Sequence, residues 1–156
     1  MCWSQDKQKF KNGRLKQSPP KPLVAEKPIT VYKKVYRVWR DGGSLRNKYY
    51  SAIIGHSYKK GELNPLVKVD FIKCRSWWQV EAGYHSWKSL DVVVSKYIRI
   101  NRDFYRGDWR IVECTIPAGT KYWVADNGDV VSEQIIIGNQ VSINELIKCY
   151  KARSKS

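Results

Sequence analysis

Residues 109–119 constrain the fold more strongly than any other stretch of the sequence. Val112, Cys114 and Ile116 alternate with Glu113 and Thr115, and this period of two is typical of a strand that is buried on one face. Pro-Ala-Gly at residues 117–119 ends the strand, because proline has no ladder donor and glycine tolerates a turn. We expect Cys114 to be a small core residue.

A hairpin is expected directly after this strand. Residues 121–124 read as a second strand, and Asn127-Gly128, two residue types that accept positive φ, marks a tight hairpin turn. Residues 130–137 return as a third strand that ends at Gly138-Asn139. Shorter strands are expected at residues 31–40, 49–54 and 66–72, with turn-like residues at 41–43 and 58–61.

Two segments have helical patterns. Ser89 can cap a helix in which Leu90, Val93, Val94 and Tyr97 share one face, although the β-branched run at residues 92–94 leaves a strand as the competing interpretation. Near the C-terminus, Ser142 and Glu145 form a capping box. The apolar stripe expected on that helix is Ile143, Leu146, Ile147 and Tyr150. The predicted fold is α+β: a twisted antiparallel sheet with one or two packed helices.

Charge is concentrated at the ends of the chain. Of a net charge of +15, residues 1–28 hold seven Lys/Arg against two acids, and residues 148–156 hold four against none. Four prolines in residues 1–28 indicate an extended or disordered arm. We therefore divide the chain into an arm (1–28), one globular domain (29–150) and a basic tail (151–156). Such excess charge favours a polyanion partner, although basic ends can also serve only for solubility.

The cysteines and the hydropathy restrict the class of protein. Cys2, Cys74, Cys114 and Cys149 form no C-x-x-C pair, so neither a metal site nor a disulfide framework is expected. The sequence lacks an apolar run long enough for a signal peptide or a membrane span. We expect a cytoplasmic protein without a membrane partner.

Short motifs resemble the ADP-ribosyltransferase superfamily over roughly two thirds of the chain. They are Val35-Tyr36-Arg37 on an early strand, the GYHS segment at residues 83–86, the TIPAGT turn at 115–120 and the SEQIII segment at 132–137. The resemblance implies an ADP-ribosyltransferase-like sheet and NAD as the cofactor. It implies that Arg37, and with it His85, contacts NAD, that Ser86 or Tyr84 lines the nicotinamide pocket, and that Glu133 orients the ribose.

Two alignments of the last motif remain open. If Glu133 is the first residue of a Glu-x-Glu motif, Ile135 occupies the catalytic position and the enzyme is inactive. If Glu133 is itself catalytic, Val131 occupies the first position, and the carboxylate stabilises positive charge on the ribose. Each residue also has a plain structural interpretation: Glu133 as a solvent-facing strand residue, Arg37 as a sheet-surface arginine beside Tyr36 and Trp39, and His85 as a donor to a backbone carbonyl.

A non-catalytic nucleic-acid-binding module is the preferred hypothesis, with no cofactor. Aromatic side chains can stack on bases while Lys and Arg follow the phosphates, and the two types interleave in residues 31–40 and 73–78. The residues expected to contact nucleic acid are Lys33, Lys34, Arg40, Lys73, Arg75 and Trp77. A third hypothesis is a structural component of a virion or larger assembly with a protein partner, since the pattern is similar to that of small phage and mobile-element proteins; the protein would then lie in the host cytoplasm or the virion.

Overall fold

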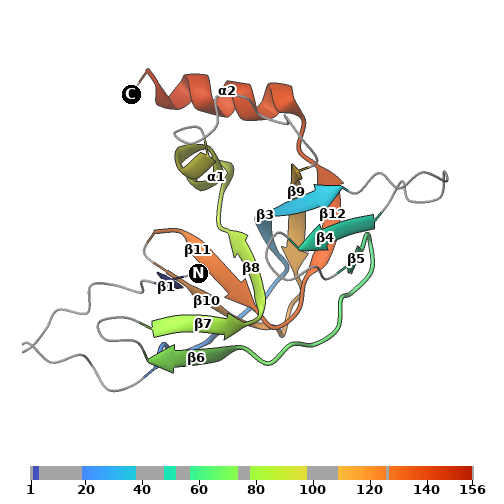
Figure 1. The fold of residues 1–156 in the computed structure, drawn as a ribbon, viewed down its shortest axis with the longest axis vertical. Coiled ribbons are helices and arrows are strands. Elements are labelled where there is room, and N and C mark those ends of the chain that lie inside the picture. The colour runs from blue at the N-terminus through green and yellow to red at the C-terminus, as the bar shows by residue number, and fades with distance from the viewer. Residues whose placement is uncertain are drawn as a thin grey trace, which may run out of the picture.

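The computed structural model describes residues 2–3, 19–37, 48–51, 57–73, 78–97, 109–125 and 127–155. In chain order the elements are β1 (Cys2–Trp3), β2 (Leu23–Val24), β3 (Ile29–Arg37), β4 (Lys48–Ser51), β5 (Ser57–Lys59), β6 (Asp70–Lys73), β7 (Trp78–Ala82), β8 (Tyr84–Trp87), α1 (Leu90–Tyr97), β9 (Trp109–Ile116), β10 (Lys121–Val124), β11 (Asp129–Ser132), β12 (Ile136–Gln140) and α2 (Ile143–Arg153). Two antiparallel sheets and two helices confirm the α+β class (Figure 1).

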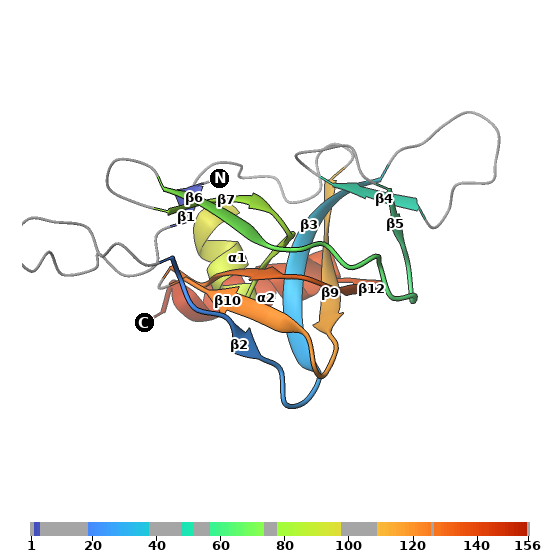
Figure 2. The same ribbon diagram turned by 90° about the horizontal axis from the view of Figure 1, so that it is seen from below.

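The larger sheet has the strand order β12-β9-β3-β8-β11-β10-β2, and β4 and β5 extend from β3. It curls round its own core (Figure 2). Ile137 of β12 and Val124 of β10 come from distant positions in this order, yet they pack in one cluster. That cluster also contains Val31, Val112 and Val130 from the strands between them. Apolar side chains on one face of β3, β8, β9, β10, β11 and β12 therefore fill the inside of the curl.

The outer face of the curled sheet is covered in two places. Helices α1 and α2 lie on one part of it, where Val93, Val94 and Leu146 pack with Trp87 and Ile111. The smaller sheet, with the order β1-β7-β6, covers another part through Val80 and Phe71, which pack with Trp123 and Val131. Figure 1 shows α2 as the outermost layer, above α1.

The strand predicted at residues 109–116 is confirmed as β9, and the strand at 121–124 as β10. The hairpin turn is also confirmed, with Gly128 at a φ of 85°. The amide of Gly128 donates to Ala125 O at 3.0 Å, and the amide of Ala125 donates to Asp129 O at 2.8 Å. The loop thus requires a left-handed residue before the ladder resumes, and glycine adopts that conformation without a Cβ clash.

The prediction of a single strand at residues 130–137 was wrong, because β11 and β12 are separate strands there. The chain leaves the ladder between β11 and β12 because its partners change: β11 pairs with β8 and β10, whereas β12 pairs with β9. Hydrogen bonds hold the corner, since Ser132 Oγ donates to Gln134 O at 2.9 Å and the Glu133 amide donates to Lys121 O at 3.1 Å. β12 then continues to Gln140 through a register shift, beyond the expected end at Gly138-Asn139.

The strand expected at residues 66–72 is shorter and later, as β6. The chain before it runs instead along residues 133–137. Amides of Gly61, Asn64 and Val67 donate to the carbonyls of Ile137, Ile135 and Glu133, respectively. Those bonds cover an edge that would otherwise expose unpaired carbonyls. Residues 38–43 and 52–54 of the predicted strands and turns lie outside the described residues.

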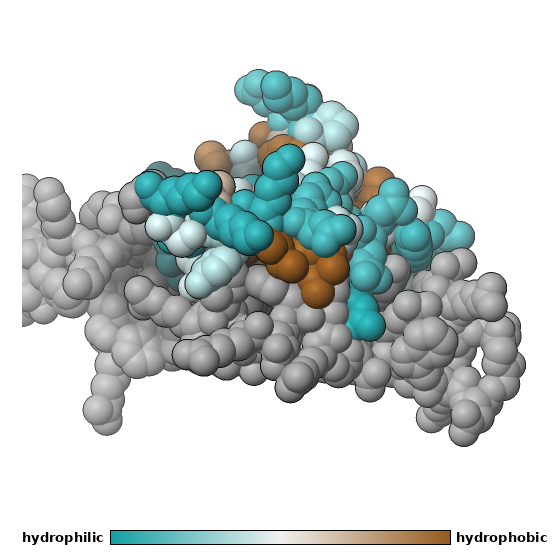
Figure 3. Space-filling view, turned by 90° about the horizontal axis from the view of Figure 1, so that it is seen from above, coloured by the Kyte–Doolittle hydropathy of each residue, from teal (hydrophilic) through white to brown (hydrophobic). Residues whose placement is uncertain are grey.

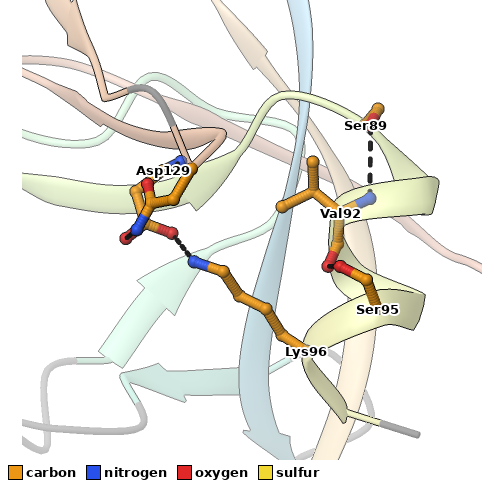
Figure 4. Close-up of polar contacts among 6 residues, drawn as sticks. Ser89, Val92, Ser95, Lys96 and Asp129 are labelled. Atoms are coloured by element: carbon orange, nitrogen blue, oxygen red, sulfur yellow. Dashed lines mark hydrogen bonds and ion pairs between the residues drawn. The ribbon is translucent and has the colours of Figure 1, made fainter. Parts of the chain in front are cut away.

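Helix α1 settles the ambiguity at residues 89–97 in favour of the helix. Ser89 Oγ accepts from the Val92 amide at 3.3 Å, and Val93 and Val94 are buried in the core beneath the helix. Lys96 extends from α1 to Asp129 at the start of β11 and forms an ion pair (Figure 4). Asn127 Nδ2 donates to the other oxygen of the same carboxylate at 2.9 Å. The helix is thereby fixed to the β10–β11 hairpin.

Helix α2 has the predicted cap, since Ser142 Oγ accepts from the Glu145 amide at 3.2 Å. The predicted buried stripe is only partly correct: Leu146 is fully buried, whereas Ile143 is 40% and Tyr150 44% exposed. The helix rests instead on the face of Leu146 and Cys149, where Cys149 Sγ contacts Asp91 Oδ1 at 3.1 Å. The helix also continues to Arg153, past the expected start of a frayed tail at Lys151.

Residues 19–28 belong to the folded domain, although the sequence assigned them to the arm. β2 pairs with β10, the Ala25 side chain is buried, and Trp123 Nε1 donates to Pro20 O at 3.1 Å. Prolines remove donors but leave their carbonyls, so this extended segment can still be held by its neighbours. Among the described residues, neither helix is long and apolar enough to cross a membrane.

Candidate functional site

The larger sheet opens on one side of β3, and most of the sequence-predicted site residues that the structure describes gather there. β3 keeps β9 as a neighbour from Ile29 to Tyr36. On its other edge it pairs with β8 at Tyr32–Trp87 and with β4 from Val35 to Arg37. Lys33 and Lys34 stand between these two partners. We call this opening, formed by Lys33, Lys34, His85 and Ser86, the seam.

Lys33 points into the core of the curled sheet. It lies between Val31 and Val35, both members of the inner cluster, and is only 6% exposed. Its Nζ donates to the backbone carbonyl of His85 at 2.6 Å and lies 5.2 Å from the centroid of the Tyr58 ring. The ammonium supplies the donor that a neighbouring strand would give in a continuous ladder. An exposed phosphate contact, as the sequence predicted for Lys33, does not match this position.

Ser86 and Tyr84 face the same interior. Tyr84 Oη donates to Pro65 O at 2.6 Å, and its ring lies 6.1 Å from that of Tyr58. Ser86 is 3% exposed, and its Oγ has no hydrogen-bond partner among the described residues. Buried hydroxyls are paired in most proteins, so the unpaired Ser86 hydroxyl distinguishes this position from the rest of β8.

Two ionisable groups of the seam, His85 and Lys34, have pKa values shifted away from their charged forms. Burial, and after it the nearby Lys33 charge, lower the pKa of His85 to about 4 against an opposing effect of Asp129. The imidazole is therefore neutral near pH 7. Burial also lowers the pKa of Lys34, which is half-buried. Both effects arise because the interior solvates a charge less well than water does.

Glu133 lies away from Ser86. It occupies the corner between β11 and β12 and is half-buried, with its carbonyl accepting from the Val67 amide at 2.8 Å. Its neighbour Ser132 pairs with Tyr84, whereas Ser86 pairs with Val130, which precedes Ser132 by two residues in β11. The register thus brings Glu133 towards the Tyr84 end of β8. Arg40, Arg75 and Trp77 lie outside the described residues, and Arg37 and Lys73 are described for their backbones only.

A basic surface on α2 was only partly anticipated from the sequence, which identified the charge of the tail but not its arrangement. Lys148 and Lys151 are exposed three residues apart on one side of α2. Lys155 is exposed just beyond the end of the helix at Arg153. Arg153 is turned away from them, and its Nη1 donates to Asp91 O of α1 at 2.9 Å. We call the set Lys148, Tyr150, Lys151 and Lys155 the α2 surface. Figure 3 views the molecule from the side of α2 and shows hydrophilic and apolar residues side by side.

Within the described part of the chain, no group of three or more His, Cys, Asp or Glu side chains is placed to hold a metal ion. Comparison with protein families, curated proteins and solved structures finds no match to this chain.

Proposed function

We propose that the protein is a small nucleic-acid-binding module that contacts its partner through the α2 surface. The arrangement of Lys148, Lys151 and Lys155 supports this most directly. Lys148 and Lys151 lie on one solvent-facing side of α2, and Lys155 is exposed just beyond its end. None of the three forms an ion pair with another described residue. Unpaired ammonium groups attract phosphates and release bound counterions when they contact nucleic acid.

Tyr150 supports single-stranded nucleic acid as the preferred form. It directly precedes Lys151 and is 44% exposed, a large fraction for an aromatic side chain. Tyr150 lies about 100° round the helix from Lys151. An exposed ring at the edge of a cationic surface can stack on an unpaired base while the lysines follow the backbone. A duplex offers no exposed base faces, so it would use only the lysines.

Binding to fluorescent single-stranded and duplex oligonucleotides over a salt series tests this proposal. The variant Lys148→Gln/Lys151→Gln/Lys155→Gln is expected to bind more weakly and to reduce the salt slope by about 2. Lys59→Gln/Lys60→Gln/Lys88→Gln is the matched control, because it removes three other exposed lysines and the same charge. An equal loss in both variants would mean general attraction without a defined surface.

Tyr150→Ala separates stacking from charge. We expect it to weaken single-strand binding by about 1–3 kcal/mol and to leave duplex binding nearly unchanged. The contribution of the N-terminal arm is better tested by replacing Lys7, Lys9, Lys11, Arg14 and Lys16 with Gln than by deletion. Deletion of residues 1–28 would also remove β1 and β2, which pair with β7 and β10.

An NAD-dependent ADP-ribosyltransferase that uses Glu133 is the second candidate. The ladder pair Ser132–Tyr84 favours it, since it brings the strand of Tyr84 beside Glu133. NAD consumption that is lost in Glu133→Gln and retained in the α2 triple variant would establish this activity and reject a binding-only role. A stable large complex, found without nucleic-acid binding and without NAD turnover, would favour the structural role in an assembly.

A further inference from the structure

Among the described residues, the inside of the seam combines a buried cation that forms no ion pair with a buried hydroxyl that has no hydrogen-bond partner. Lys33 has three N–H donors. One donates to His85 O, and the Tyr58 ring lies over the ammonium group. No carboxylate forms an ion pair with Lys33 within the part of the chain that the structure describes. A carbonyl and a ring compensate a buried charge only partly, because neither carries a negative charge.

Ser86 stands across from Lys33. The pair Tyr32–Trp87 fixes the antiparallel register, and one step along it places Lys33 opposite Ser86. Both side chains face the inner cluster, Lys33 between Val31 and Val35, and Ser86 two residues after Tyr84. The Ser86 hydroxyl has no hydrogen-bond partner among the residues that the structure describes. Two donors on adjacent strands therefore face the same interior.

The surroundings of Lys33 and Ser86 indicate which kind of acceptor would suit both groups. A negative charge would compensate Lys33, and an acceptor without donors of its own would suit Lys33 and Ser86 alike. The neighbouring interior is apolar, with Val31, Val112 and Val130 in the same cluster. Such a site favours a small ion that needs few hydrogen bonds over a heavily hydrated polyatomic one.

We propose that the seam binds a monovalent anion of halide size between Lys33 Nζ and Ser86 Oγ. The ion stabilises the part of β3 at which its pairing partner changes from β8 to β4. The site lies inside the curled sheet and is separate from the α2 surface, so it does not depend on nucleic-acid binding. A water molecule could satisfy the Ser86 hydroxyl, but it would leave the charge of Lys33 uncompensated.

Chloride-35 NMR line broadening and thermal unfolding test the proposal on the full chain. Sodium chloride is exchanged for sodium gluconate at constant ionic strength, so that screening stays the same. The wild type is expected to show saturable excess line width, and a higher Tm in chloride than in gluconate. Ser86→Ala and Lys33→Met should each remove at least nine tenths of the excess line width and the dependence of Tm on the anion.

Two control variants separate the site from general effects. Lys34→Met removes a neighbouring positive charge from the same strand, on its opposite face. Thr120→Val removes the other buried hydroxyl without a partner among the described residues, in the turn beside Ala25. Both should keep the chloride dependence of the wild type. Ser86→Ala should be at least as stable as the wild type in gluconate and less stable in chloride.

Three results would overturn the proposal. The wild type could show no saturable line width, Ser86→Ala could retain it, or Thr120→Val could lose it equally. Retention in Lys33→Met would assign the broadening to exposed lysines and would mean an adventitious ion only. If Lys33→Met fails to fold, Ser86→Ala and crystals of the wild type grown in bromide decide whether the site exists. Crystals grown in sodium bromide should show an anomalous peak between Lys33 and Ser86, and its absence would reject the site.

Discussion

The Lys33 ammonium donates a 2.6 Å hydrogen bond to the backbone carbonyl of His85, across the opening between β3 and β8. A side chain thus replaces a ladder bond where two strands diverge. The same contact places a positive charge beside the imidazole of His85, whose burial already disfavours its protonated form. Because burial and the Lys33 charge both lower the pKa of His85, its titration shows whether the seam is folded.

The stability of the protein should fall on acidification through the pH range in which His85 titrates. The pKa of His85 is about 4 in the folded protein, against 6.5 for an ordinary histidine. Between these values the unfolded chain binds the proton and the folded chain does not, so stability decreases as pH falls from 6.5 to 4. The contribution lost by pH 5 is about 2 kcal/mol.

Urea unfolding of the wild type and of His85→Gln at pH 7.5 and pH 5 measures this contribution. Glutamine cannot titrate, so the variant should lose less stability on acidification. Carboxylates titrate in both proteins, and the difference between the two proteins isolates the histidine. An equal loss in both would show that His85 does not keep a lowered pKa.

Substitution at Gly128 should be more harmful than the same substitution at Gly119. Both have positive φ, 85° and 82°, and alanine costs about 1–2 kcal/mol there. A Cβ on Gly128 would also lie 2.6 Å from Val92 Cγ2 of α1, whereas a Cβ on Gly119 meets nothing within 4 Å. We expect Gly128→Ala to cost about 1–3 kcal/mol more than Gly119→Ala, as measured by chemical denaturation. Equal losses would mean that α1 does not pack against the hairpin turn.

The ion pair between Lys96 and Asp129 should contribute more than the pair between Lys59 and Glu62. Asp129 is buried and also accepts from Asn127, whereas Lys59 and Glu62 are largely exposed and 3.8 Å apart. Lys96→Met leaves a buried carboxylate without its cation and should cost about 2 kcal/mol. Lys59→Met should change the unfolding free energy by less than about 0.5 kcal/mol. Similar values for both would contradict the docking of α1 shown in Figure 4.

The orientation of α2 predicts different losses along its apolar residues. Leu146 is fully buried, so Leu146→Ala should cost about 2–5 kcal/mol through the lost contacts and the cavity that remains. Ile143→Ala should cost less than about 1 kcal/mol, because its side chain already meets solvent. Denaturant midpoints of the two variants provide the test. A larger loss at Ile143 would mean that the helix is rotated.

Cys114 and Cys149, the cysteines whose side chains the structure describes, should resist alkylation in the folded protein. Burial raises the pKa of Cys114 to about 12, and burial together with the Asp91 contact raises that of Cys149 to about 11. At pH 8 only about one Cys114 in ten thousand is then a thiolate, the reactive form. Mass spectrometry after iodoacetamide treatment should find both unmodified in buffer and modified in urea. Rapid native labelling of Cys114 would contradict its place in the core.

Patterns within short segments determined the local structure. Residues 112–116 of β9 alternate, Gly128 is required by the turn, and Ser89 and Ser142 accept bonds from the first turns of their helices. Each depends on residues close in sequence, so the sequence alone was sufficient. The α+β class followed from the same patterns, because alternating strands and capped amphipathic helices must bury one face each.

Only the tertiary structure decided where the strands change partners and which charges are buried. The break between β11 and β12, the burial of Lys33 and the exposed row on α2 arise from contacts across the chain. Lysine is usually exposed, so nothing in residues 31–40 indicated that Lys33 reaches a carbonyl 52 residues away. Local propensity fixes the conformation of a segment, whereas its neighbours in the sheet fix which side chains water can reach.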